Sequence, residues 1–366
     1  MKVIDKIIEN FTLQYPITRL CPPEKALFLD IETTGFTARS SVLYLIGCAY
    51  YQDENWHTIQ WMSENPSEQS EILDAFFDFA KTRNFLIHYN GNQFDLPYLT
   101  QKCLQLELSH NFESFEGADV YRRLFPYKSF LNLLNLKQKT IEYFLSIDRE
   151  DLFDGGELIA FYQDYVKHPT DGTLKTLLLH NEEDLKGMLS ILPMLSYFDA
   201  FHFPLTAKKV QANHYRDVND CHRMELILHA ELPVPVPKEV TASKDGFYAK
   251  LSGSELSLRI PVFEEELKYY YSNYKEYYYL PAEDLALHKS VAAYVDKSHR
   301  EQATARNCYT RKPSAYLQEW DLTFTPFFKK DYDDPEIYFE LTDELKQDRE
   351  AFAKYASLVL NHLANA

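Results

Sequence analysis

The segment Phe28-Leu29-Asp30-Ile31-Glu32-Thr33-Thr34-Gly35 joins an apolar run to two carboxylates and ends at a turn-forming glycine. Side chains two residues apart on a β-strand point to the same face, so Asp30 and Glu32 are expected to leave the strand together. Two such acids repel each other unless a cation lies between them, and a hard divalent metal ion suits that place. A half-exposed strand with two solvated acids is an equally good interpretation of the pair alone.

The sequence around this segment predicts a sheet that begins as a meander. Three strands are expected in succession, over residues 26–31, 42–51 and 56–62, with turn-forming or polar residues between them. The elements expected after them alternate: a helix over 68–81, a strand over 85–89, a helix over 96–106, a strand near 117–120, and helices over 130–145 and 157–165. Strands that first form a meander and then alternate with helices indicate a mixed α/β sheet.

Two further segments carry side chains suited to chemistry. In His88-Tyr89-Asn90-Gly91-Asn92-Gln93-Phe94-Asp95, a strand passes through a polar turn into a helix that begins at Asp95. An aspartate at this place is favoured by the helix dipole without any other function. His180 and Asp184 lie one turn apart on a helix expected from an N-cap at Thr173 to about Leu192, so they share a face. Taken alone, a histidine on such a helix is usually an ordinary surface or partly buried side chain.

Together the three segments resemble the DEDD exonucleases of the ribonuclease-H-like superfamily, the group that contains polymerase proofreading domains. The shared pattern is a strand with Asp-x-Glu, then Asn-x-x-x-Phe-Asp, then a helical Asp, over about residues 24–195. The residues that match the four acids of the family are Asp30, Glu32, Asp95 and Asp184. Asn90 and Phe94 fit the middle motif as it occurs in family-B polymerase proofreading domains.

One position departs from the usual pattern. Members of the DEDD group carry either a tyrosine four residues before the last aspartate or a histidine five residues before it. This chain has His180 at four residues and Leu179 at five. A bacterial family of predicted exonucleases with a His-Asn-x-x-Asp motif is the closer match, and the resemblance implies that His180 is the catalytic base.

The resemblance also implies a site for two magnesium or manganese ions. Four carboxylates can hold two such ions ~3.5–4 Å apart, so that one activates a water and the other stabilises the leaving 3′ oxygen. Asp30 is expected to bridge the ions, Asp184 to complete the nucleophile side, and Asp95 to act through water. Thr33, Thr34 and Asn90 are expected near the terminal nucleotide, although the threonines fit a role in the turn equally well.

The rest of the chain predicts a second domain. With 366 residues, of which 45% are hydrophobic, the chain has enough apolar material for two globular cores. The composition of the sequence changes between Asp199 and Ala207, where we expect the domain boundary. A stiff proline segment (233–237) follows, and then a segment (246–262) in which apolar and polar residues alternate as in hairpin strands. The expected divisions are a leader over 1–23, a ribonuclease-H-like domain with a mixed sheet flanked by helices over 24–200, and a smaller α+β accessory domain of unknown role over 201–366.

Several other classes of protein are excluded. The apolar runs are too short for a membrane span and no secretory signal opens the chain, so a cytoplasmic location is expected. The sequence contains none of four common catalytic or binding motifs: the phosphate-binding loop Gly-x-x-x-x-Gly-Lys-Ser/Thr, the hydrolase nucleophile motif Gly-x-Ser-x-Gly, the dinucleotide-binding motif Gly-x-Gly-x-x-Gly and the zinc-protease motif His-Glu-x-x-His. The cysteines, an odd number without a Cys-x-x-Cys pair, are expected to be reduced and mostly buried: Cys21, Cys48, Cys103, Cys221 and Cys308. A grouping without standard zinc spacing is interpreted as structural: His214, Cys221, His222 and His229.

The net charge of −17 bears on the substrate, because it repels polyanions at long range, although bound metal ions reverse the sign within a cleft. The most basic window, residues 288–313, interleaves cations with Tyr294 and Tyr309, as in a single-strand groove or a solvated face. The tyrosines of 269–279 can stack on bases, but packing of their rings in a small core is the simpler account. The sequence thus favours a metal-dependent 3′–5′ exonuclease acting on single-stranded DNA or RNA ends. A catalytically inactive module that binds nucleic acid or a protein partner is the alternative.

Overall fold

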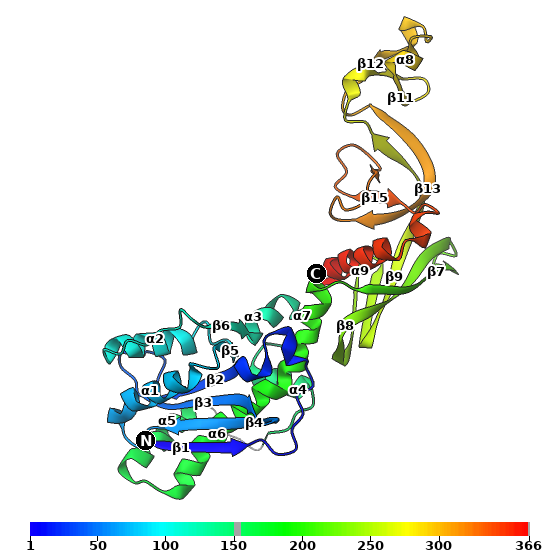
Figure 1. Cartoon of the computed structure of the whole chain (residues 1–366). Helices are drawn as coiled ribbons and strands as arrows, with labels where there is room; N and C mark the ends of the chain where they lie inside the picture. Colours follow the sequence, from blue (N-terminus) through cyan, green and yellow to red (C-terminus); the bar gives the residue numbers. More distant parts are fainter. Residues whose placement is uncertain (150–154, 365–366) are drawn as a thin grey trace. The chain divides into compact units, whose positions relative to one another are not determined.

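The computed structural model describes residues 1–149 and 155–364 (Figure 1). The chain folds into two compact units. One comprises Met1–Asp199 with Val236–Lys238, and the other comprises Ala200–Pro235 with Glu239–Ala366. Within the described ranges, no helix has both the length and the apolar character that crossing a membrane requires.

The N-terminal unit is built on a six-stranded sheet in the order β1-β4-β3-β2-β5-β6. Its strands are β1 (Lys2–Ile7), β2 (Ala26–Thr33), β3 (Leu43–Gln52), β4 (Asn55–Met62), β5 (Phe85–His88) and β6 (Glu116–Asp119). The meander β2-β3-β4 and the edge strand β1 are antiparallel, whereas β5 pairs in parallel with both β2 and β6. The predicted mixed sheet is therefore confirmed, and β2, which carries Asp30 and Glu32, is an interior strand.

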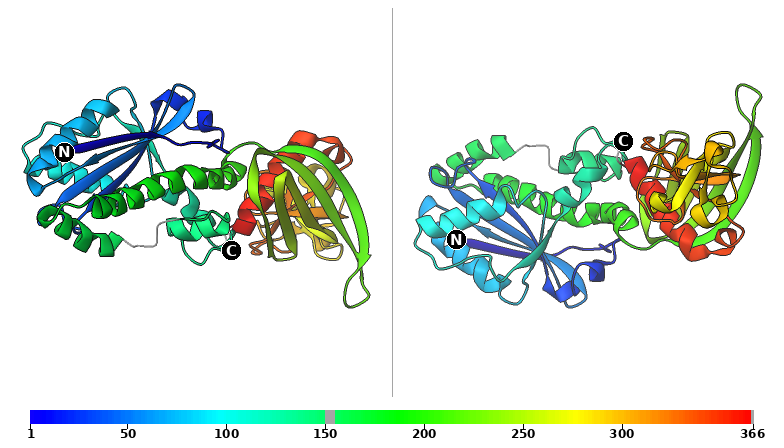
Figure 2. Two further views of the ribbon diagram at one scale, coloured as in Figure 1. Left: turned by 90° about the horizontal axis from the view of Figure 1, so that it is seen from below. Right: turned by 90° about the horizontal axis from the view of Figure 1, so that it is seen from above.

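The helices of this unit are α1 (Gln69–Ala80), α2 (Asp95–Gln105), α3 (Val120–Leu124), α4 (Gln138–Phe144), α5 (Gly155–Lys167) and α6 (Asp171–Ile191), and α7 (Leu195–His202) begins in it. Helices α1 and α2 pack on one face of the sheet, and α5 and α6 pack on the other. Leu27 and Leu29 of β2 pack with α1 and α2, whereas apolar residues of β3 and β4 on the other face pack with α5 and α6. Figure 2 shows α6, in green, running along this second face of the strands. Because side chains alternate along a strand, Asp30 and Glu32 point toward α6.

Residues 1–23 differ from the expected leader. Lys2–Ile7 pairs with β4 along its whole length and forms the edge of the sheet. Farther along, Tyr15 donates a hydrogen bond to Asp199 (2.9 Å) and Arg19 forms an ion pair with the same carboxylate (2.8 Å). The charged residues of β1 interrupt the hydrophobic alternation that would indicate a strand. Such charges are common on edge strands.

Two helix boundaries also differ from expectation. A helix was expected over 130–145, but Asn132 has a positive φ of 52° and α4 begins only at Gln138. Most apolar residues before it, among them Phe130 and Leu131, are buried in irregular structure, so helix-like spacing there reflects burial and not a helix. Helix α6 begins at Asp171, and its N-cap is Thr170, whose side chain accepts a hydrogen bond from Thr173 N at 3.2 Å.

The C-terminal unit contains a six-stranded sheet, β14-β15-β13-β9-β8-β7, and a three-stranded sheet, β11-β10-β12. Its strands are β7 (Thr206–Arg216), β8 (His222–Lys244), β9 (Phe247–Tyr270), β10 (Tyr277–Leu280), β11 (Leu285–His288), β12 (Glu301–Gln302), β13 (Tyr309–Glu319), β14 (Phe327–Phe328) and β15 (Ile337–Glu340). Its helices are α8 (Lys289–Ala292) and α9 (Arg349–Ala364). Residues 246–262, in which hairpin strands were expected, lie almost entirely within the single strand β9, which pairs with its neighbour β8. Tyr271 stacks on Tyr277 with ring centroids 4.6 Å apart, so these tyrosines pack on one another.

Candidate active site

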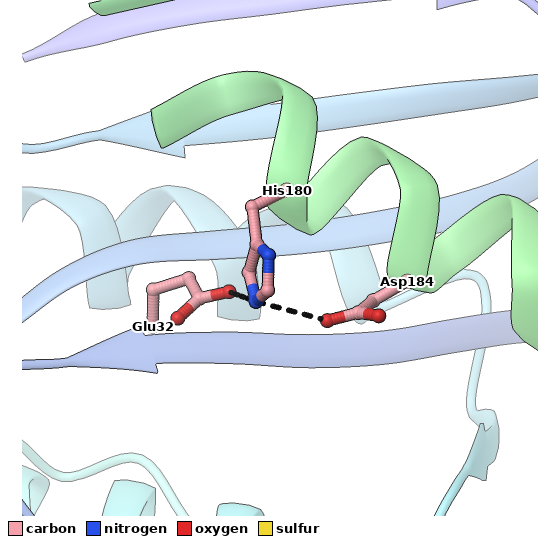
Figure 3. Close-up of side chains that lie close together, drawn as sticks. All are labelled: Glu32, His180 and Asp184. Atoms are coloured by element: carbon pink, nitrogen blue, oxygen red, sulfur yellow. Dashed lines mark ion pairs between the residues drawn. The ribbon is translucent and has the colours of Figure 1, made fainter. Parts of the chain in front are cut away.

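Glu32, His180 and Asp184 converge between β2 and α6 (Figure 3). His180 Nε2 lies 3.6 Å from Glu32 Oε1 and 3.4 Å from Asp184 Oδ2, so the imidazole stands between the two carboxylates. Glu32 and His180 are buried, and Asp184 is partly exposed. The one-turn spacing of His180 and Asp184 therefore does place both side chains toward the strand acids.

Asp30 is held by Asn181, the neighbour of His180 on α6. Asn181 Nδ2 donates to Asp30 Oδ2 at 2.7 Å, and Asn181 Oδ1 accepts from Gln60 Nε2 at 2.8 Å. Asp30, Gly47 and Gln60 lie opposite one another on β2, β3 and β4. A Cβ on Gly47 would lie only 1.9 Å from Asn181 Oδ1, so glycine is required for this close approach. The sequence marked Asn181 only as part of a motif.

Asp95 opens α2, as expected, and is only 8% exposed. Burial raises its pKa to about 7, against the opposing effect of hydrogen bonds from the backbone of Asp95 and Ile31. Burial also raises the pKa of Asp30 well above its usual value, and the negative charges of Asp184, Glu32 and Asp95 add to this effect. The four acids thus form one electrostatic cluster, in which Asp184, Glu32 and Asp95 oppose the ionisation of Asp30.

This donor set fits a hard divalent cation. Glu32, His180 and Asp184 each offer one ligand atom, and these atoms all lie within 4.8 Å of one another. Within residues 1–149 and 155–364, this is the group of acidic, histidine and cysteine side chains that could hold a metal ion. Carboxylate oxygens are the preferred ligands of magnesium and manganese, and a bound cation would remove the repulsion that raises the pKa of Asp30. The histidine and cysteine grouping of β7 and β8 forms no such cluster in the described part of the chain.

Asp119, which the sequence analysis did not single out, shapes the turn that leads to Asp95. Its Oδ1 accepts from Asn90 N at 3.0 Å and from Arg122 N at 3.2 Å, and its Oδ2 accepts from Asn92 N at 3.4 Å. These bonds hold Asn90 at a positive φ of 63°. An aspartate directly before a helix is a common N-cap, and this signal could have identified it.

The three residues expected near a terminal nucleotide differ in their surroundings. Thr33 Oγ1 donates to Gly35 O at 2.9 Å, and Thr34 Oγ1 accepts from Val42 N at 2.8 Å, so both hydroxyls stabilise the turn after β2. Asn90 Oδ1 is buried without a hydrogen-bond partner among the described residues. Asn90 is therefore the one of the three whose side-chain oxygen has unmet hydrogen-bonding capacity.

The basic window of the C-terminal unit is largely occupied by local partners. Lys289 and Arg300 lie over the ring of Tyr278, at 5.2 Å and 4.8 Å from its centroid. Other cations of the window form ion pairs: Arg306 with Asp333, Arg311 with Glu266 and Asp284, and Lys312 with Glu340. Its role as a single-strand groove stays a prediction.

Comparison with known proteins identifies the N-terminal fold. Solved structures similar to this chain include a family B DNA polymerase from Pyrobaculum calidifontis (TM-score 0.40, 16% identity, 49% of this chain and 26% of that one). They also include E. coli ExoI in complex with ssDNA (0.29, 12%, 57% and 55%) and Exonuclease I from Methylocaldum szegediense (0.29, 13%, 56% and 54%). The chain therefore spans about a quarter of the polymerase and little more than half of the exonucleases. No curated protein matches the sequence. Residues 27–196 match the RNase_H_2 family model of the RNase_H superfamily, and the N-terminal unit has an RNase H-like fold.

Proposed function

We propose that this protein is a metal-dependent 3′–5′ exonuclease that hydrolyses the phosphodiester bonds of single-stranded nucleic acid ends. The observation that carries the proposal is the convergence of Glu32, His180 and Asp184, with Asp30 and Asp95 in the same electrostatic cluster. A cluster of buried acids destabilises a protein unless a cation compensates it, and bound divalent cations can activate water for phosphodiester hydrolysis.

The residues that would hold the metal ions are Asp30, Glu32, Asp95 and Asp184. Two magnesium or manganese ions would supply an activated water and stabilise the leaving 3′ oxygen. Asn181 fixes the direction of the Asp30 carboxylate through its 2.7 Å hydrogen bond, and Gln60 fixes Asn181 in turn. Asp119 plays the corresponding part for Asp95, because it holds the turn from which α2 begins.

His180 would take the proton of the attacking water. An imidazole can accept a proton near neutral pH, and the carboxylates of Glu32 and Asp184, 3.6 Å and 3.4 Å from its Nε2, would stabilise the charge that it gains. Its four-residue spacing from Asp184 does not prevent this role, because the ring still reaches the cluster. The buried oxygen of Asn90, together with Thr33 and Thr34, would contact the terminal nucleotide.

The direction of hydrolysis and the preference for single strands follow from the resemblance of the three sequence motifs to DEDD exonucleases. DNA and RNA both fit the proposal, because metal ligands and phosphate contacts are common to the two, and only a contact to the 2′-hydroxyl separates them.

The test is release of nucleotides from 3′-labelled and 5′-labelled single-stranded DNA and RNA in the presence of Mn²⁺. The wild type is expected to shorten strands stepwise from the 3′ end, and Asp30→Asn is expected to abolish this. His180→Ala should slow it by roughly 10²–10⁴-fold, the usual contribution of a general base. Glu71→Gln, which removes an exposed carboxylate of α1, is the control and should retain full activity. A wild type that cleaves no strand with any metal ion would refute the proposal in favour of an inactive module that binds nucleic acid or a protein partner.

A further inference from the structure

The second oxygen of Asp184 is held by a partly buried arginine, Arg149. Asp184 Oδ2 faces His180, whereas Asp184 Oδ1 forms an ion pair with Arg149 Nη2. The side chain of Arg149 is only 10% exposed. The two oxygens of this carboxylate therefore have different partners: Arg149 at Oδ1 and His180 at Oδ2.

Arg149 is in turn held by Glu142 of α4, which is 1% exposed. Arg149 Nη1 lies 3.1 Å from Glu142 Oε2 and 3.3 Å from Oε1. Gln138, one turn earlier on α4, donates from Nε2 to Glu142 Oε1 at 3.0 Å and to the backbone oxygen of Asp184 at 2.9 Å. A continuous polar network thus runs from α4 through Arg149 to Asp184 on α6.

A glycine on α6 leaves the room for this network. A Cβ on Gly187 would lie 2.1 Å from Glu142 Oε1 and 2.7 Å from Gln138 Nε2. Glycine is less favourable than alanine within a helix, so its presence inside α6, toward the C-terminal end, calls for a packing reason. The buried carboxylate of Glu142 supplies that reason, because it occupies the space of the missing side chain.

We propose that Arg149 is a positioning residue that fixes the carboxylate of Asp184 with Oδ2 toward Glu32 and His180. This inference rests on the proposed function, in which Asp184 is a metal ligand. Arginine suits the role because its planar fork of donors can bond two carboxylates at once, which a lysine does less well. Glu142 balances the charge of Arg149, so the pair orients Asp184 without placing a net positive charge beside the metal ions.

A single substitution at Arg149 would change both the orientation of Asp184 and the stability of the fold. Arg149→Met leaves the buried Glu142 without its cation, and breaking one side of a buried ion pair is strongly destabilising. The double variant Arg149→Met/Glu142→Gln removes both charges together. It therefore keeps the net charge of the chain and leaves no unpaired buried ion, but Asp184 Oδ1 loses its partner. In this variant, any loss of metal affinity reflects the lost orientation of Asp184.

The experiment measures Mn²⁺ binding to the full chain by titration calorimetry and by the electron paramagnetic resonance signal of free Mn²⁺. The double variant is expected to bind Mn²⁺ about 10–100-fold more weakly than the wild type, the range usual for loss of a group that orients a metal ligand. Without metal, Arg149→Met should lower the melting temperature more than the double variant does. Arg149→Lys, which keeps the charge, should recover part of the affinity.

The outcomes separate the two proposals. If the wild type binds Mn²⁺ and the double variant binds it equally well, the positioning role is overturned while the proposed function stands. If the wild type binds no Mn²⁺ and cleaves no strand, both are overturned. Should the double variant fail to fold, Arg149→Lys decides, because an affinity equal to that of the wild type would show that the fork geometry of arginine is not needed.

Discussion

The metal-free protein should lose stability as the pH rises from about 4 to about 7, because buried acids then lose their protons. Burial raises the pKa of Asp95 from 3.8 to about 7. Asp95 therefore binds its proton more tightly in the folded chain than in the unfolded chain. By linkage, the free energy of unfolding is greatest below pH 3.8 and falls as the pH rises through this window. Asp30, whose pKa is also raised, acts in the same direction.

The size of the effect follows from the pKa of Asp95. A change from 3.8 to about 7 corresponds to about 4 kcal/mol, of which about 2.5 kcal/mol falls between pH 5 and pH 8. Domains are typically stable by only about 5–15 kcal/mol, so the loss should be easy to measure. Bound Mn²⁺ compensates the carboxylates in place of protons, so it should stabilise the protein more at pH 8 than at pH 5.

The assay is urea unfolding in the presence of a chelator at pH 5 and at pH 8. Asp95→Asn keeps the shape of the side chain and removes its charge, so it should be more stable than the wild type at pH 8 and should lose about 2.5 kcal/mol less between the two pH values. Glu71→Gln, at an exposed position of α1, should follow the wild type. The reasoning is refuted if Asp95→Asn and the wild type lose the same free energy of unfolding between pH 5 and pH 8.

Three further predictions concern the surroundings of the site and the thiols. Gly47→Ala places a Cβ 1.9 Å from Asn181 Oδ1, so it should lower the free energy of unfolding by about 1–3 kcal/mol and weaken Mn²⁺ binding. Gly172→Ala, whose Cβ would meet only Thr170 Oγ1 at 3.9 Å, an ordinary van der Waals contact, is its control, and an equal effect of both would contradict the close approach. Asp119→Ala should speed hydrogen exchange at the amides of Asn90 and Asn92, and unchanged exchange would show that the turn does not depend on this carboxylate. Iodoacetamide should label Cys221 first in the native protein, because this cysteine is exposed. Burial raises the pKa of three other thiols to about 11, those of Cys21, Cys103 and Cys308, so they should react slowly. The variant Cys221→Ser should remove the rapid labelling.

The sequence predicted the parts of the site that depend on local geometry. Asp30 and Glu32 face one way because side chains alternate along a strand, and His180 and Asp184 share a face because they are one turn apart on a helix. In the structure, Glu32 lies beside His180 and Asp184, and Asp30 accepts a hydrogen bond from Asn181 of the same helix. The supporting residues were missed because their roles depend on distant partners. Arg149 and Asp184 are 35 residues apart, and no local pattern connects them.

The same distinction explains the fold. The meander and the flanking helices carry hydrophobic periods of their own, so they could be predicted. Strand β1 carries no such period and is ordered by pairing with β4, a contact across more than fifty residues. Helix α9 is a different case, because Phe352, Val359 and Leu363 already follow a helical spacing in the sequence and are buried. This spacing is typical of a helix, so α9 could have been predicted from the sequence.

The arrangement of the acids bears on whether the protein is an enzyme or only a binding module. Burial and three neighbouring carboxylates raise the pKa of Asp30, which is unfavourable for folding of the metal-free chain, and the four acids also repel the phosphates of a nucleic acid. A module that only binds strands gains nothing from them. Asp30→Asn therefore separates the two functions by its effects on cleavage and on the Mn²⁺ dependence of strand binding. In a binding module it should raise both the stability of the metal-free chain and its affinity for single strands in chelator, and Mn²⁺ should change neither. In a nuclease it should likewise stabilise the metal-free chain, but it should abolish cleavage and weaken the Mn²⁺-dependent binding of strands. A variant that binds strands with the same Mn²⁺ dependence as the wild type would contradict the assignment of Asp30 as a metal ligand.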